Sequence, residues 1–435
     1  MKYTDPKMTE QSRDNENNVK AERSKKHSRI IFVVIFTFLL SVCLWKIFYH
    51  QSADENIGAI SADEKLAAIE ATRAIPDSEN AALIYNRLLQ DPNASSLTSN
   101  LPESIDNTSF HQALYKPWLN SEYPELAAWI KQHQYVTDTL LKAAQFEKCR
   151  FPIIIDITDT SQIDRAAPMR QWAFFLSFAA NNDLAENRTD SAIAKWRTII
   201  QMGHHLSQQP TIIDQILAHG IGRIALENIA RFVINGNATE QSLQKIDILP
   251  LAIQNRWSNL DKQINEVKNL QKEKLTEKYG PIDKQKYQSL NKIFESIPEL
   301  DVSIGYKKYI ATARGVRILV ALRRYKNKSG HWPRFLNDIK SQLPDEVFTD
   351  PINNGSFIYK PTDDGFKLYS KGKNNIDEDG QKNFTLDTDS FEAIYQQDDV
   401  TFWPLKIPDM EQENNNDDED AYLKEMEEMM KLTEL

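Results

Sequence analysis

The sequence predicts a mainly α-helical protein with an N-terminal transmembrane helix, an α-helical body and a small C-terminal α+β module. Three observations lead to this fold class: an apolar run near the N-terminus, a long region of helically spaced apolar residues, and a helix followed by a hairpin pattern. We divide the 435 residues into a disordered cytoplasmic segment (1–29), an anchor (30–48), a body (62–300), a module (301–408) and an acidic tail (409–435).

The anchor is the apolar stretch that begins at Ile30 and ends at Phe48, with Lys46 as its one charge. Its helix would reach roughly 28 Å at about 1.5 Å per residue, which matches one hydrocarbon core. A cleaved signal peptide is the alternative, but the nearest small-x-small site, Ala59-Ile60-Ser61, lies well past the stretch. We therefore expect an uncleaved signal-anchor.

Charges on the two sides of the anchor indicate its orientation. Asp54 and Glu55 follow it, and five basic residues precede it: Lys20, Arg23, Lys25, Lys26 and Arg29. This asymmetry predicts a single-pass protein of the cytoplasmic (inner) membrane, with a cytoplasmic N-terminus and a periplasmic bulk.

The net charge of −10 is unevenly distributed. The tail carries eleven acidic and two basic residues, and residues 1–29 carry eight basic and five acidic ones, which leaves the middle only weakly acidic. Without a basic surplus the body is not expected to bind nucleic acid. Cys43 lies in the anchor and Cys149 is alone in the rest of the chain, so no intramolecular disulfide framework forms.

The body reads as successive helices separated by Pro and Gly, for example at Pro76, Pro92 and Pro210. Short links between amphipathic runs predict helical hairpins, a layout similar to tetratricopeptide-like repeats, although the repeat consensus is absent. A later amphipathic helix is predicted from five apolar residues at alternating spacings of four and three: Ile253, Trp257, Leu260, Ile264 and Val267.

Three histidines of the body, His204, His205 and His219, are the candidates for catalysis. Adjacent histidines point about 100° apart on a helix, and Pro210 separates them from His219, so the spacing does not favour a metal site. The sequence contains no Gly-rich phosphate loop, no Gly-x-Ser-x-Gly elbow and no His-Glu-x-x-His motif. An interaction or structural role is therefore favoured over an enzyme. A membrane-anchored hydrolase with a site in the helical body remains the alternative.

The module begins with a helix whose apolar residues are Ala311, Gly315, Ile318, Leu322 and Tyr325. The sequence Gly-His-Trp-Pro at 330–333 then ends the helix, and strands at 357–360 and 366–370 flank a five-residue hairpin loop at 361–365. An acidic loop follows at 371–380.

Over residues 305–404 this order resembles the globular part of the major pseudopilin of type II secretion. The resemblance implies a helix packed on a small antiparallel sheet, a location outside the cytoplasm, and bound calcium. The prepilin cleavage site is absent, and about 250 residues separate anchor and module, so the chain is not an ordinary pilus subunit. A component of a secretion or envelope assembly is a further alternative, with protein partners of unknown identity.

The resemblance implies that Asp377, Asp379 and Asp399 hold the calcium. The residues alone indicate a related pattern, because Asn375, Asp377 and Asp379 place oxygen ligands at alternate positions before Gly380, as in the first half of a calcium loop. The second half of that loop is missing. We therefore predict a calcium site at Asn375, Asp377, Asp379 and Asp399; a solvated acidic surface loop is the alternative.

Overall fold

The computed structural model describes residues 60–156, 159, 161–235, 238–251, 257–279, 302–386 and 393–406. The predicted cytoplasmic segment, the anchor at 30–48 and the acidic tail at 409–435 lie outside these residues. Within the described ranges, no helix has both the length and the apolar character needed to cross a membrane.

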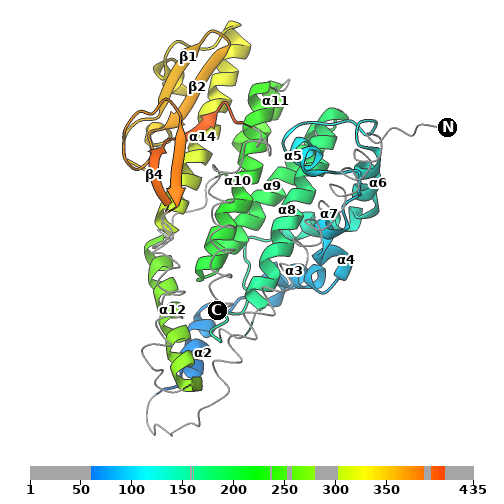
Figure 1. Ribbon diagram of the computed structural model, residues 1–435, viewed down its shortest axis with the longest axis vertical. Helices are drawn as coiled ribbons and strands as arrows, with labels where there is room; N and C mark the ends of the chain where they lie inside the picture. Colours follow the sequence, from blue (N-terminus) through cyan, green and yellow to red (C-terminus); the bar gives the residue numbers. More distant parts are fainter. Residues whose placement is uncertain are drawn as a thin grey trace, which may run out of the picture.

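The predicted mainly α-helical fold is confirmed (Figure 1). The helices are α2 (Ala62–Thr72), α3 (Ala82–Leu89), α4 (Pro92–Ser95), α5 (Asn107–Tyr115), α6 (Pro124–Gln132), α7 (Gln134–Ala143), α8 (Ser161–Ala185), α9 (Thr189–Ser207), α10 (Ile212–Asn235), α11 (Glu240–Asp247), α12 (Trp257–Tyr279) and α14 (Val302–Ser329). Short 3₁₀ helices are η1 (Asp77–Glu79), η2 (Leu97–Asn100), η3 (Leu336–Gln342) and η4 (Asp345–Phe348).

Helices α8, α9 and α10 form the centre of the body. Only three residues link α8 to α9, and Asn187 in this link takes a positive φ of 61°. Pro210 lies in the gap between α9 and α10, as its effect on helices predicts. Helix α8 buries large apolar side chains on several faces, among them Trp172, Phe175 and Phe178, because other helices surround it.

The C-terminal sheet is small and antiparallel. Its strands are β1 (Ile358–Thr362), β2 (Gly365–Ser370) and β5 (Val400–Trp403), in the order β1-β2-β5, and a separate hairpin joins β3 (Lys382–Leu386) to β4 (Ala393–Asp398). The hairpin loop is shorter than expected. Thr362 pairs with Gly365, so the loop has two residues, and Pro361 lies within β1. β1 is an edge strand, where a missing N–H is tolerated.

Helix α14 joins the sheet to the body. It ends as predicted at Gly330, whose φ of 84° is the left-handed conformation of a helix C-terminus and whose N–H donates to the Lys326 carbonyl. One side of α14 packs on α10 and another on β2 and β5 (Figure 1). A single apolar core therefore continues from Ala81 in the body to Phe402 in the sheet.

A second, smaller apolar cluster joins α2 to α12, at the end of the molecule opposite the β1–β2 hairpin (Figure 1). Val267 and Leu270 of α12 are buried there. Ion pairs flank the cluster, with Lys274 2.5 Å from Asp63. The predicted apolar face of this helix is thus confirmed at Ile264 and Val267, which are 5% and 2% exposed.

Candidate metal site

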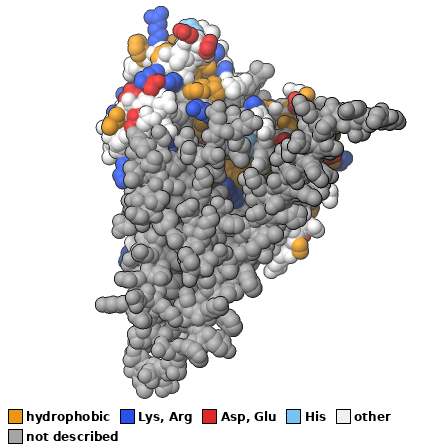
Figure 2. All heavy atoms as spheres, viewed as in Figure 1, with side chains coloured by type: hydrophobic (Ala, Val, Ile, Leu, Met, Phe, Trp, Pro, Cys, Tyr) orange, Lys and Arg blue, Asp and Glu red, His pale blue; other side chains and the backbone are white. Residues whose placement is uncertain are grey.

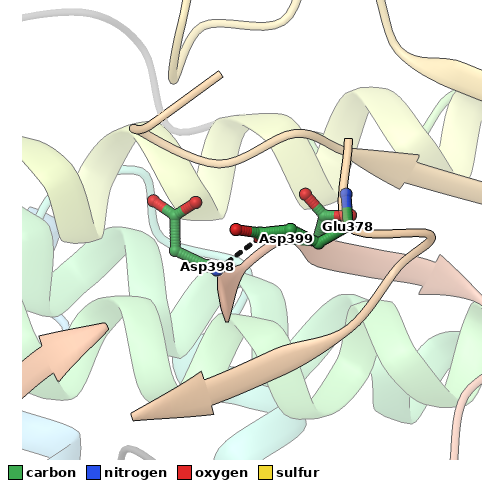
Figure 3. A group of neighbouring side chains, drawn as sticks. All are labelled: Glu378, Asp398 and Asp399. Carbon is green, nitrogen blue, oxygen red and sulfur yellow. Dashed lines mark hydrogen bonds between the residues drawn. The ribbon is translucent and has the colours of Figure 1, made fainter. Parts of the chain in front are cut away.

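The acidic loop between β2 and β3 meets the turn between β4 and β5, and three carboxylates converge there. Glu378 comes from the loop, and Asp398 and Asp399 come from the turn (Figure 3). Each offers an oxygen, and these oxygens lie within 4.8 Å of one another. Three carboxylates at this spacing can hold a metal ion.

Asp398 uses one carboxylate oxygen to fix the loop. Its Oδ2 accepts hydrogen bonds from the backbone N–H groups of Lys373 (2.6 Å) and Asn374 (3.1 Å). Its own N–H donates to Oε2 of Glu378 at 2.8 Å, the bond dashed in Figure 3. The two segments that carry the carboxylates are therefore tied directly to each other.

Asp399 is arranged in the same way. Its Oδ2 accepts from the backbone N–H groups of Glu378 (3.1 Å) and Gly380 (2.8 Å). The hydroxyl of Thr401 donates to the Gly380 carbonyl at 3.0 Å and holds the same part of the loop. Asp399 is only 1% exposed, so backbone dipoles replace the water that would otherwise solvate its charge.

The other oxygen of each aspartate is left without a partner. Oδ1 of Asp398 and Oδ1 of Asp399 are both buried, and neither has a hydrogen-bond partner among the described residues. A buried carboxylate oxygen without a partner is costly, and a bound cation would satisfy it. There is no room for a side chain at Gly372 beside this oxygen. A Cβ on Gly372, where φ is 62°, would lie 2.2 Å from Asp398 Oδ1.

The charge balance at this point favours a cation. Burial raises the pKa of Asp399 to about 6, the N–H groups of Gly380 and Glu378 oppose the rise, and the negative charges of Glu378 and Asp377 add to it. Burial is the largest cause of the rise, and the nearby carboxylates add negative charge that no lysine or arginine among the described residues offsets at the free Oδ1 of Asp399. A metal ion would supply the offsetting positive charge.

The carboxylates of Asp377 and Asp379 are engaged by a tyrosine and two lysines. Tyr369 donates its hydroxyl to Asp377 at 2.7 Å, and this bond, together with Lys360, lowers the pKa of Asp377. Lys367 binds Asp379 at 2.6 Å and Lys360 binds it at 3.1 Å; both lower its pKa, with Lys367 the larger cause. Figure 2 shows basic and acidic side chains intermixed at this end of the molecule.

Of the four ligands predicted from the sequence, the structure thus places one, Asp399, in the carboxylate cluster. Asn375 is exposed and has a φ of 59°, and the carboxylates of Asp377 and Asp379 are engaged by lysines.

Glu378 and Asp398 were not among the ligands predicted from the sequence. That prediction relied on alternate positions, but the loop takes positive φ at Gly372, Asn375, Asp379 and Gly380, so side-chain directions do not alternate as in extended chain. The adjacent pair Asp398-Asp399 was the available signal, since the loop residues bind both aspartates.

The histidines of the body lie in separate surroundings. His205 is fully buried: its Nδ1 accepts from the Tyr85 hydroxyl at 2.8 Å, and its Nε2 donates to the Phe146 carbonyl at 2.8 Å. His204 bonds the backbone of Pro250, and His219 stacks on Tyr309 with ring centroids 5.9 Å apart. Burial lowers the pKa of each of the three to about 4.

Two acidic residues that precede α8, Asp156 and Asp159, could in principle act together with these histidines, but each binds another group. Asp156 forms an ion pair with Lys278 at 2.8 Å, and Asp159 accepts from the backbone N–H of Ser161 at 2.9 Å. Among the described residues, Asp156 and Asp159 do not join the three histidines in a group that could hold a metal ion.

Comparison with protein-family models, with curated proteins and with solved structures finds no match to this chain.

Proposed function

We propose that this chain is a single-pass membrane protein with an interaction or structural role, whose C-terminal module binds calcium through Glu378, Asp398 and Asp399. The observation that carries the calcium proposal is the pair of buried Oδ1 atoms without partners, on Asp398 and Asp399. Backbone N–H groups hold the second oxygen of each aspartate, so the free oxygens are fixed in place before any cation arrives.

Calcium fits this ligand set better than other common metals. The three side chains offer only carboxylate oxygens, which hard cations prefer, whereas zinc sites are usually built from Cys and His. Calcium takes about 6 to 8 oxygen ligands in flexible geometry, so water and backbone carbonyls complete its shell, and magnesium demands a stricter octahedron. The bound ion would neutralise the carboxylates and tie the loop to the β4–β5 turn.

The arrangement of the C-terminal elements supports a pseudopilin-like module. A long helix, α14, packs on a three-stranded antiparallel sheet, and the acidic loop leaves the sheet directly after β2. The location outside the cytoplasm rests on the apolar run at 30–48 and the basic residues before it. A role within a secretion or envelope assembly is consistent with both features. The separate surroundings of His204, His205 and His219 do not favour the hydrolase.

Calcium is expected to raise the melting temperature of the full chain in detergent micelles. At a calcium concentration of about 100 times Kd, binding to the folded state contributes about 2.7 kcal/mol. Asp399→Asn removes the central ligand and abolishes the rise. The matched control is Asp379→Asn, which keeps the rise, because that carboxylate binds Lys360 and Lys367.

Differential scanning calorimetry with EGTA or calcium measures both variants. A calcium response that survives Asp399→Asn would refute the site. If Asp379→Asn abolishes the response and Asp399→Asn does not, calcium binds instead at the alternate residues Asn375, Asp377 and Asp379 that the sequence pattern indicated.

The topology is tested separately with reporter fusions. Alkaline phosphatase joined after Leu435 should be active, and a fluorescent protein that matures only in the cytoplasm should stay dark at the same position. The opposite pair of results would place the folded region in the cytoplasm and contradict the proposal.

A further inference from the structure

A groove lies between the first turns of α14 and the segment around η4, away from the carboxylate cluster. Its volume is about 470 Å³, within the roughly 300 to 1,000 Å³ of ligand-binding pockets. Four lining residues come from α14 and four from the facing wall: Ser303, Tyr306, Lys307 and Arg314, and Glu346, Thr349, Pro351 and Asn354.

The groove carries a positive surplus, because Lys307 and Arg314 face the single acid Glu346. Lys307 has no ion-pair or hydrogen-bond partner among the described residues. Arg314 donates one N–H to the Thr349 carbonyl at 2.6 Å, which leaves the rest of its guanidinium for other acceptors. Its charge also acts on Tyr306: burial raises the pKa of that phenol and Arg314 opposes the rise.

At least one other cation of the same helix is already neutralised by carboxylates. Helix α14 contains eight basic and no acidic residues. Near its C-terminal end, Arg324 binds Glu240 at 3.0 Å and also pairs with Asp247. Neither Lys307 nor Arg314 forms an ion pair within the described residues, although Arg314 is close enough to Asp350 to act on its pKa. The groove is therefore suited to a carboxylate-bearing ligand.

The chain supplies such a ligand close by. Residues 409–435 carry eleven acidic and two basic residues. The described chain ends at Lys406, only a few residues after Phe402, whose ring packs against Gly315, the neighbour of Arg314. Glu411 follows Phe402 by nine residues, a reach of up to about 30 Å, whereas Lys307 lies only about 12 Å along the helix from Gly315.

We propose that the acidic segment 411–420 docks in this groove within the same chain, with its carboxylates on Lys307 and Arg314. The groove is then covered by the chain's own tail, and any other acidic peptide must displace that tail to enter.

Carbodiimide crosslinking of the full chain in detergent micelles, followed by mass spectrometry, tests the docking because it joins only touching amines and carboxylates. Lys307 should crosslink to residues 411–420. Lys328 is exposed at the other end of α14, and it serves as the control for random encounter. A mixture of ¹⁴N- and ¹⁵N-labelled protein separates links within one chain from links between two copies.

Arg314→Gln should reduce the Lys307 crosslink about three- to fivefold, since one exposed ion pair is worth up to about 1 kcal/mol. About 0.5 M NaCl should reduce it further, because the Debye length is then only about 4 Å. Equal yields at Lys307 and Lys328 would overturn the proposal, and links that form only between copies would overturn its intrachain part.

A second measurement does not depend on lysine reactivity. A labelled synthetic peptide of residues 409–422 should bind the chain truncated after residue 408, and it should bind the full chain at least about tenfold more weakly, a difference of about 1.4 kcal/mol. Equal binding to both proteins, or binding to neither, would contradict the docking.

Discussion

The helical body and the C-terminal carboxylate cluster both bury charge, but they balance it differently. In the body, Asp214 is 1% exposed and pairs with Arg165, which is itself buried. In the cluster, Asp399 is equally buried, and no lysine or arginine reaches its free Oδ1 within the described residues. The body thus satisfies its buried charges internally, whereas the cluster leaves oxygens for a partner that the chain does not supply.

The difference follows from where the partner groups come from. Asp214 receives hydrogen bonds from Arg165 at 2.7 and 2.9 Å and from the Thr211 hydroxyl at 2.6 Å, all from the α8–α10 region. Asp183 likewise binds Lys195 of the neighbouring helix α9. In the module, Lys360 and Lys367 pair with Asp377 and Asp379 and not with the carboxylate cluster. The same loop therefore carries two carboxylates paired with lysines and one, Glu378, that belongs to the cluster.

Breaking the internally balanced charge of the body should have the largest effect. Asp214→Ala leaves Arg165 buried without a counter-charge, and we expect it to lower the free energy of unfolding by about 3 to 5 kcal/mol. Chemical denaturation of the full chain, followed by tryptophan fluorescence, measures the loss. The loss relative to the unsubstituted chain should be the same in calcium as in EGTA, because this substitution leaves the carboxylate cluster intact.

The matched control removes both charges. Arg165→Met together with Asp214→Leu should recover most of the stability, since an apolar pair of similar volume often replaces a buried ion pair without loss. A double variant as unstable as Asp214→Ala, or a loss for Asp214→Ala that is smaller in calcium than in EGTA, would contradict the comparison between body and cluster.

Local sequence patterns predicted the elements well where the deciding interactions are local. Helix α14 and its end at Gly330 follow from apolar spacing and from a glycine that can take positive φ. The acidic loop was also predicted as the candidate site. Asp399, the predicted ligand outside that loop, lies in the carboxylate cluster because the β4–β5 turn returns to the loop.

Interactions between distant segments could not be predicted in this way. The backbone conformation at Asn375 and Asp379 turns Asp377 and Asp379 toward the lysines and leaves Glu378 facing the turn, and no residue pattern specifies those dihedrals. The packing of α12 on α2 joins segments about 200 residues apart, so its apolar face was predictable but its partner was not.

Lowering the pH should change the stability contributed by His205 in the body and by Asp399 in the cluster in opposite directions. The effect should be smaller than that of Asp214→Ala. The pKa of buried His205 is lowered to about 4, below its ordinary 6.5, so unfolding takes up a proton and stability is lost as pH falls from about 6.5 toward 4. The pKa of Asp399 is raised to about 6, above its ordinary 3.8, so in the calcium-free protein its contribution to stability increases as pH falls through the same window.

Stability measured in EGTA between pH 6.5 and 5 tests both signs. His205→Gln should make the loss on acidification smaller by up to about 2 kcal/mol, at about 1.4 kcal/mol per pH unit. His204 and His219 are unchanged in that variant, so the difference isolates His205. Asp399→Asn should make the loss steeper, because it removes a group that opposes it. If both substitutions shift the pH dependence in the same direction, the body and the cluster do not balance their buried charge in different ways.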